Sequence, residues 1–108
     1  RGLSRGRGAL SLRVIYHPAA RAEHLQQVAY YEAQAPGLGA RYQRAVQAAV
    51  EKISEGPHRH PVVADPEVRR FSVARFPFAV FYSHTQSEIE ILAVAPHRKA
   101  PGYWRGRI

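Results

Sequence analysis

The chain has 108 residues, of which 45% are apolar and 22% charged, a composition that fits one globular domain with a modest core. It contains no cysteine, which excludes disulfide bonds and thiolate chemistry, and no apolar run long enough to cross a bilayer. No charged and then apolar leader opens the sequence, so we expect a cytoplasmic protein without membrane contact.

The net charge of +8 is unevenly distributed. Residues 1–11 carry three arginines, and residues 12–67 carry six basic and six acidic groups. Residues 68–108 carry seven basic groups against two acidic ones, so the excess charge beyond the first segment lies in the C-terminal half. This distribution favours an anionic partner, either nucleic acid or an acidic protein segment, over a charge that serves only solubility.

The first eleven residues, RGLSRGRGALS, predict a flexible basic arm outside the fold, because Gly, Ser and Arg dominate them. The segment lacks methionine, so we expect processing, an unusual start or a remnant of cloning. The apolar, partly β-branched run Leu12–Tyr16 then predicts a first strand. His17 and Pro18 end this strand, and Pro18 is expected to open a helix that ends near Gln34.

A second helix is predicted from Leu38 to Ile53, where apolar residues recur every three or four positions. Gly56 and Pro57 stop it. The short APGLG break between the two helices predicts an antiparallel hairpin. Three tyrosines on these helices are interpreted as core residues: Tyr30, Tyr31 and Tyr42.

The remaining sequence predicts a Pro-rich irregular loop, His58–Pro66, and three strands: Val68–Ala74, Phe78–Tyr82 and Glu88–Ala95. The middle strand is apolar on both faces and should lie centrally in the sheet. The expected fold class is therefore α+β, in the order β-α-α-β-β-β. A helical hairpin would pack on one face of a small, largely antiparallel twisted sheet and leave the other face free.

No pattern in the sequence predicts a metal or a cofactor. His58 and His60 lack a third ligand at a recognisable spacing, and no nucleophile signature or phosphate-binding Gly motif occurs. The sequence does combine cations with His and Tyr, which suits metal-free RNA cleavage and equally suits simple binding. Of the neighbours Arg69 and Arg70, one should face solvent or an acid such as Glu88 or Glu90. Trp104 is expected to anchor the C-terminal segment in the core.

Several strings, in this order, resemble the RelE/ParE superfamily of bacterial toxins from type II toxin–antitoxin modules, often described as plasmid stabilisation proteins. The helices carry HPAARAEHLQQVAYYE and GLGARYQRAVQAAVEKI, and the strands carry RRFSVARFPFAVFY and ILAVAPHRKAPGYW. The resemblance covers about Leu12 to Arg107, so we expect residues 12–108 to form a single toxin domain. It implies a growth-inhibiting toxin that a cognate antitoxin neutralises.

The activities of this superfamily are divided. ParE-like members poison DNA gyrase, whereas RelE-like members cut messenger RNA, usually on the ribosome. The long helices and the FPFAVFY strand resemble the ParE side and slightly favour gyrase as the target. A metal-independent endoribonuclease is the alternative, and a non-toxic RNA-binding or interaction-only relative is a further one.

The resemblance also implies site residues. For a ribonuclease they would be Arg69, Arg98, Lys99 and Tyr103. Relatives commonly place His directly after the last strand, where Pro96 stands here, so His97 departs from that pattern. The surface that an antitoxin covers and a target meets is expected to contain Arg69, Arg70, Arg75, Arg98, Lys99 and Trp104.

Overall fold

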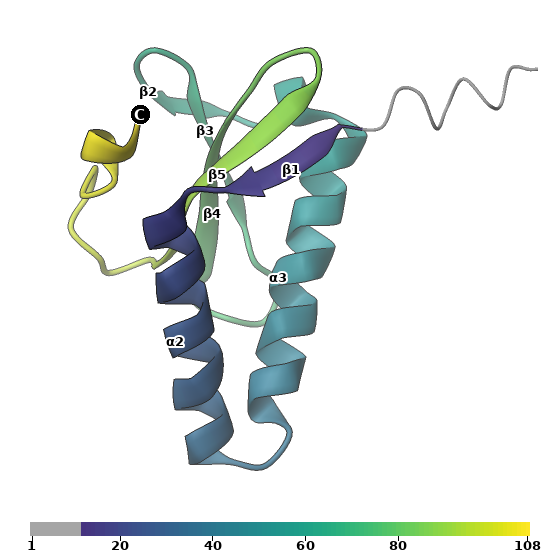
Figure 1. The fold of residues 1–108 in the computed structure, drawn as a ribbon, viewed down its shortest axis with the longest axis vertical. Coiled ribbons are helices and arrows are strands. Elements are labelled where there is room, and N and C mark those ends of the chain that lie inside the picture. Colours follow the sequence, from purple (N-terminus) through teal and green to yellow (C-terminus); the bar gives the residue numbers. More distant parts are fainter. Residues whose placement is uncertain (1–11) are drawn as a thin grey trace, which may run out of the picture.

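The computed structural model describes residues 12–108, and the predicted basic arm lies outside them. It contains two long helices, five strands and two short 3₁₀ turns (Figure 1). In chain order these are β1 (Arg13–Tyr16), α2 (Pro18–Gln34), α3 (Leu38–Glu55), η1 (Pro57–Arg59), β2 (Val62–Ala64), β3 (Val68–Ser72), β4 (Phe78–His84), β5 (Glu88–Pro96) and η2 (Arg105–Arg107).

The strands form one open sheet in the order β1-β5-β4-β3-β2. β1 runs parallel to β5, and the other neighbours are antiparallel. β4 is the central strand, as its apolar sequence predicted. The predicted α+β class and the β-α-α-β-β-β order are confirmed, with one further strand added at the edge.

A tight turn sets the antiparallel hairpin of α2 and α3. Gly37 adopts the left-handed conformation (φ 86°) that lets the chain reverse. The carboxylate of Glu32, on α2, accepts hydrogen bonds from the backbone N–H groups of Gly37 (2.9 Å) and Gly39 (3.0 Å). The last turn of α2 therefore caps the first turn of α3 and fixes the hairpin.

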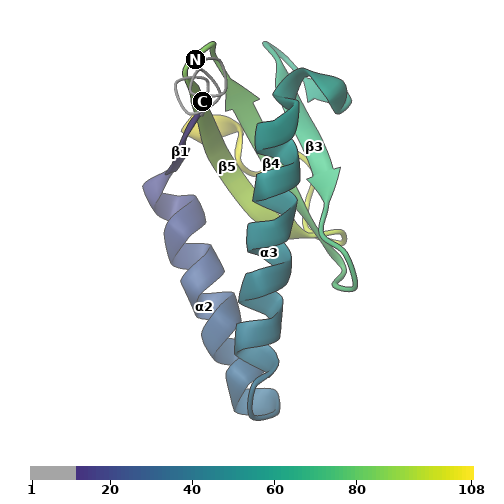
Figure 2. The same cartoon turned by 90° about the vertical axis from the view of Figure 1, so that its right-hand side faces the viewer.

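The sheet is covered on both faces. The helical hairpin packs on one face, where apolar residues such as Tyr42, Ile53, Val80 and Ile91 are buried. The segment after β5 folds back over the opposite face (Figure 2), and Trp104, only 3% exposed, stacks on Phe81 there (centroids 5.3 Å apart). Trp104 is thus an anchor, as predicted, but the expectation of a free face was wrong.

A bulge in β5 decides which side chains reach that far face. The pairing shifts between Phe81, opposite Ala93, and Tyr82, opposite Ile91, which leaves Leu92 as an extra residue. Ile89, Ile91 and Val94 pack with the helices, whereas Leu92, Ala93 and Ala95 pack with Trp104. Beyond the bulge the alternation is therefore shifted by one residue.

Two further predictions were wrong. The supposed irregular loop His58–Pro66 contains part of the η1 turn and the edge strand β2, whose brevity hid it. Tyr30 is 56% exposed rather than packed in the core, because it lies on the outer side of α2, while Tyr42 is fully buried. Within residues 12–108 neither helix is long and apolar enough to span a membrane.

Candidate interaction surface

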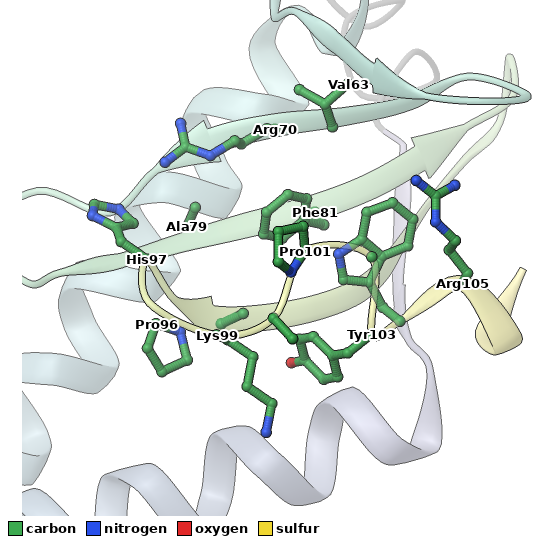
Figure 3. Close-up of a pocket in the computed structure, with 14 residues that line it drawn as sticks. Val63, Arg70, Ala79, Phe81, Pro96, His97, Lys99, Pro101, Tyr103 and Arg105 are labelled. Atoms are coloured by element: carbon green, nitrogen blue, oxygen red, sulfur yellow. The ribbon is translucent and has the colours of Figure 1, made fainter.

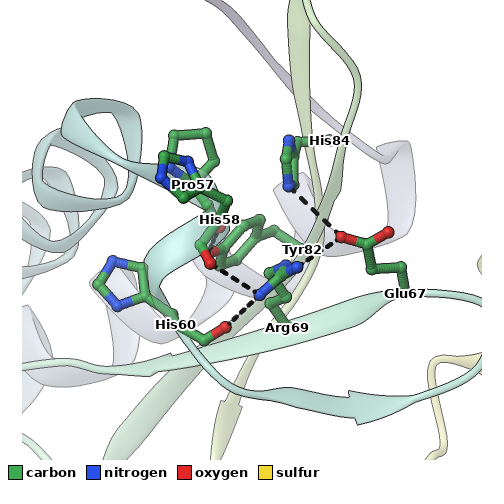
Figure 4. A network of polar contacts seen from close by, with 7 residues as sticks. All are labelled: Pro57, His58, His60, Glu67, Arg69, Tyr82 and His84. Carbon is green, nitrogen blue, oxygen red and sulfur yellow. Dashed lines mark hydrogen bonds and ion pairs between the residues drawn. The ribbon is translucent and has the colours of Figure 1, made fainter.

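Arg69 belongs to a polar cluster at the end of α3 (Figure 4). Its Nη1 donates hydrogen bonds to the backbone carbonyls of His58 (3.0 Å) and His60 (2.6 Å). Its Nη2 donates to Glu67 (2.5 Å), so the acid that faces this arginine is Glu67 and not Glu88 or Glu90 as expected. Glu88 instead pairs with Arg13 (3.2 Å). Arg69 thereby joins β3 to the residues that follow α3.

Two more residues complete this cluster on β4. The Tyr82 hydroxyl donates to the Pro57 carbonyl (2.6 Å), and burial raises the Tyr82 pKa to about 12. His84 Nε2 lies 3.8 Å from the Glu67 carboxylate, whose pKa the Arg69 hydrogen bond lowers. All these contacts tie elements of the fold together, which is the pattern of a structural network.

Tyr103 is held by a second network that fastens the C-terminal segment to α2. Its hydroxyl donates to Glu23 (3.1 Å), and Arg107 binds the same carboxylate through two nitrogens (2.5 and 2.9 Å). Arg107 also donates to the Leu92 carbonyl (2.9 Å). Burial is the main reason that the Tyr103 pKa rises to about 12, and the Arg107 hydrogen bond lowers the Glu23 pKa.

The three basic residues that follow β5, at positions 97–99, lie in different surroundings. His97 is fixed by its backbone N–H on the Pro77 carbonyl (2.9 Å) and by Nε2 on the Phe78 carbonyl (3.1 Å). Arg98 is exposed and borders a groove shared with Tyr30 and Tyr31 of α2. Lys99 points toward α2 with its Nζ 4.9 Å from the Tyr103 ring centroid.

Arg70 projects from the opposite face of β3 to Arg69, as alternation along a strand requires. Its Nη1 donates to Ser72 Oγ (3.3 Å), and among the described residues no carboxylate lies within ion-pair distance of it. Arg75 is exposed in the turn between β3 and β4, with a positive φ of 71°.

A hollow of about 200 Å³ lies between the far face of the sheet and the C-terminal segment (Figure 3). Phe81 and Pro101 lie on one side of it, with Arg70 and His97 on the other. Trp104, which stacks on Phe81, belongs to the first wall. Lys99, Tyr103 and Arg105 also border it. Trp104 therefore reaches this hollow as a wall but offers little surface of its own.

The predicted ribonuclease residues are not gathered at one place. Arg69 lies opposite Tyr82 of β4 in the sheet register. His97, which precedes Arg98 and Lys99, is bonded to the backbone of Pro77, five residues before Tyr82 and so at the other end of β4. At about 3.3 Å per residue the two ends are roughly 16 Å apart. Arg69 also faces the helices, while Arg70 lines the hollow on the far face.

Two members of the Tyr103 network, Glu23 and Arg107, were not predicted from the sequence, because they lie 84 residues apart and carry no local motif. Their neighbourhood follows only from the folding back of the C-terminal segment. Tyr103 was identified as a site residue, but its bond to Glu23 was not foreseen. No pattern in the sequence predicted these contacts, which become visible only in the tertiary structure.

The hairpin and the mixed sheet define a small α+β protein with a basic surface. The family model for the "ParE toxin of type II toxin-antitoxin system, parDE" matches residues 14–101, and the chain belongs to this family within the RelE/ParE superfamily. No curated protein sequence matches significantly. Seven chains of solved structures match, among them one from the "Chromosomal ParDE TA system from P. aeruginosa". That chain superimposes with a TM-score of 0.68 at 17% identity, covering 80% of this chain and 96% of its own length, and so supports the fold.

Proposed function

We propose that this toxin acts by binding a protein target, DNA gyrase, rather than by cutting RNA. The supporting observation is the separation of the candidate catalytic residues. Metal-free RNA cleavage needs a proton acceptor and cations around one phosphate. Arg69 is instead occupied by three acceptors at the end of α3, and Tyr103 is bound to Glu23 of α2.

The protonation state of Tyr103 argues in the same direction. A general base must lose its proton near neutral pH, and the pKa of this hydroxyl is raised to about 12. Its hydrogen bond to a carboxylate also opposes ionisation. The group that the superfamily resemblance offered as a catalyst is therefore better suited to holding the C-terminal segment in place.

Three arginines without an acidic partner fit an acidic antitoxin. Arg70, Arg75 and Arg98 have no carboxylate within ion-pair distance among the described residues. Lys99 follows Arg98 directly in the segment after β5. An acidic segment of a cognate antitoxin would neutralise this surface and prevent it from binding the target. Toxin, antitoxin and gyrase would meet in the cytoplasm.

RNA cleavage remains the second candidate because one observation favours it. Arg70, His97 and Lys99 border the same hollow, which therefore combines two cations with an imidazole. In a ribonuclease these residues, rather than Arg69 and Tyr103, would surround the scissile phosphate. This set differs from the one that the resemblance implied.

The purified chain can be tested against both targets. Incubation with DNA gyrase, ATP and supercoiled plasmid should give linear DNA with gyrase covalently attached, detected after detergent and protease treatment. The chain incubated with messenger RNA, with and without ribosomes, should leave it intact. An R98A/K99A variant should lose the gyrase effect and R44Q, on the exposed side of α3, should keep it. RNA cleavage that R70Q abolishes, without gyrase-linked breaks, would contradict the proposal.

A further inference from the structure

The hollow on the far face owes its existence to two alanines in the central strands. Ala79 of β4 pairs with Ala95 of β5, and both side chains are directed away from the helices. Their small side chains leave a floor between the bulky wall of Phe81 and Pro101 and the polar wall of Arg70 and His97 (Figure 3). An apolar slot with a charged end is the result.

The walls of this slot carry cations and no acid. Its lining contains Arg70, Lys99 and Arg105 but no Asp or Glu. Three arginines elsewhere in the described residues are instead paired with a carboxylate: Arg69 with Glu67, Arg107 with Glu23 and Arg13 with Glu88. Figure 3 shows Arg70 and His97 at one end of the slot, Arg105 at the other, and Lys99 pointing toward α2.

The Arg70 end is built to receive an anion. A guanidinium binds oxyanions with two parallel N–H groups, and Arg70 has only the weak contact to Ser72 (3.3 Å) to give up. Lys99 and Arg105 add positive potential near the slot. A phosphate monoester, which is a dianion near neutral pH, gains more from the Arg70 guanidinium and from this surrounding positive potential than a single carboxylate does.

The remaining space is suited to a flat ring. Ala79 and Ala95 form the floor, and Phe81 and Pro101 supply an apolar wall against which a ring can pack. At about 200 Å³ the hollow is smaller than a drug-sized site, so it would enclose one ring and its charged substituent while the rest of the ligand stays outside.

We propose that this slot binds a planar ring carrying a phosphate monoester, of the chemical class of the nucleoside monophosphates. The ring lies over Ala79 and Ala95, and the phosphate accepts hydrogen bonds from Arg70. Such a site goes beyond the choice between gyrase and RNA as target, since it requires neither.

Trp104, the only tryptophan in the chain, provides the measurement. Titration of the full chain with adenosine monophosphate should change Trp104 fluorescence and shift the Arg70 side-chain and Trp104 indole signals in NMR spectra. Adenosine and benzoate, which lack the phosphate, should bind about tenfold more weakly or worse. Added salt should weaken binding of the monophosphate.

Variants locate the site. R70Q should weaken binding about tenfold or more, and A79V, which narrows the floor, should also weaken it. R44Q removes a charge on the exposed side of α3 and should leave the affinity unchanged. NMR spectra of each variant would show whether it is folded. If R70Q does not fold, A79V still tests the same slot.

Three results would overturn the proposal. One is equal affinity for adenosine or benzoate and the monophosphate. Another is equal loss in R70Q and R44Q, which would mean a diffuse charge effect. The third is equal binding of an unphosphorylated dinucleotide, because the phosphodiester of a nucleic acid chain, and not a terminal phosphate, would then be the ligand.

Discussion

Arg107 donates two hydrogen bonds, 2.5 and 2.9 Å long, to the carboxylate of Glu23, 84 residues earlier in the chain. Both side chains are largely screened from solvent, at 14% and 34% exposure. The pair holds the C-terminal segment against the start of α2, and Tyr103 donates to the same carboxylate. This contact keeps Trp104 in its place on the sheet and Arg98 and Lys99 at the surface.

Replacing Arg107 by Gln should loosen that segment. We expect a loss of about 1–2 kcal/mol in the free energy of unfolding, because a partly buried bidentate pair is broken and Glu23 stays behind without its cation. Hydrogen exchange of residues 97–108 should accelerate more than that of β4. R98Q serves as the control, since Arg98 is exposed and forms no hydrogen bond within the described residues. Equal exchange in both variants would contradict a fastening role.

His24 makes stability depend on pH. It is 8% exposed, lies between the rings of Tyr16 and Tyr42, and its Nδ1 has no hydrogen-bond partner. Burial, aided by Arg21, lowers its pKa below the usual 6.5. The unfolded chain then binds the proton more readily, so this contribution is complete above about pH 6.5 and is lost as the pH falls through the folded pKa.

Urea unfolding at about pH 7.5 and about pH 5.5 measures this effect. We expect a lower midpoint at the acidic pH, and a smaller difference between the two in H24F. His60 also has its pKa lowered by burial, so some of the acid sensitivity should remain in the variant. A difference as large in H24F as in the parent chain would assign the sensitivity to other groups.

At Gly39 the two helices of the hairpin approach each other closely. A Cβ atom there would lie 2.6 Å from the Val28 carbonyl oxygen and 2.9 Å from the Glu32 side chain. G39A should therefore separate the helices and cost about 1–3 kcal/mol of the free energy of unfolding. G106A, whose new methyl group would meet no atom within 4 Å, is the matched control. Thermal unfolding that G39A leaves unchanged would show that the hairpin adapts freely.

Trp104 should be the largest single contributor to the far core. W104A removes a 3% exposed ring and its stack on Phe81, and we expect a loss of about 3–5 kcal/mol. W104F keeps the aromatic contact and should cost clearly less. Denaturant titrations followed by circular dichroism compare them. Near-equal stability of the parent chain and W104A would mean that the C-terminal segment contributes little to folding.

Sequence periodicity predicted the helices and the three longer strands, because their apolar residues recur at spacings set by one covered face. It failed where one residue changes the alternation. The bulge at Leu92 moves Ala93, Ala95 and the following His97 onto the far side, and nothing in EILAVAPH marks it. The three-residue β2 was too short to give a pattern, and its pairing with β3 depends on the fold.

The candidate site was predictable as a list of residues but not as an arrangement. Arg70, Lys99 and Trp104 border one hollow, which the sequence did not predict. The roles of Arg69 and Tyr103 depend on Glu67 and Glu23, and the second of these partners is 80 residues distant. Sequence shows which charges exist, whereas only the tertiary structure shows which of them are already paired.

The most direct test of gyrase as the target is pulse-labelling of DNA and protein synthesis in bacteria immediately after the chain is induced without an antitoxin. Our account predicts that DNA synthesis falls first, that cells filament, and that translation continues during the same interval. The R98A/K99A variant should lessen the effect, while R44Q should not. An immediate fall in protein synthesis with intact DNA synthesis would contradict the account and assign the toxin to RNA.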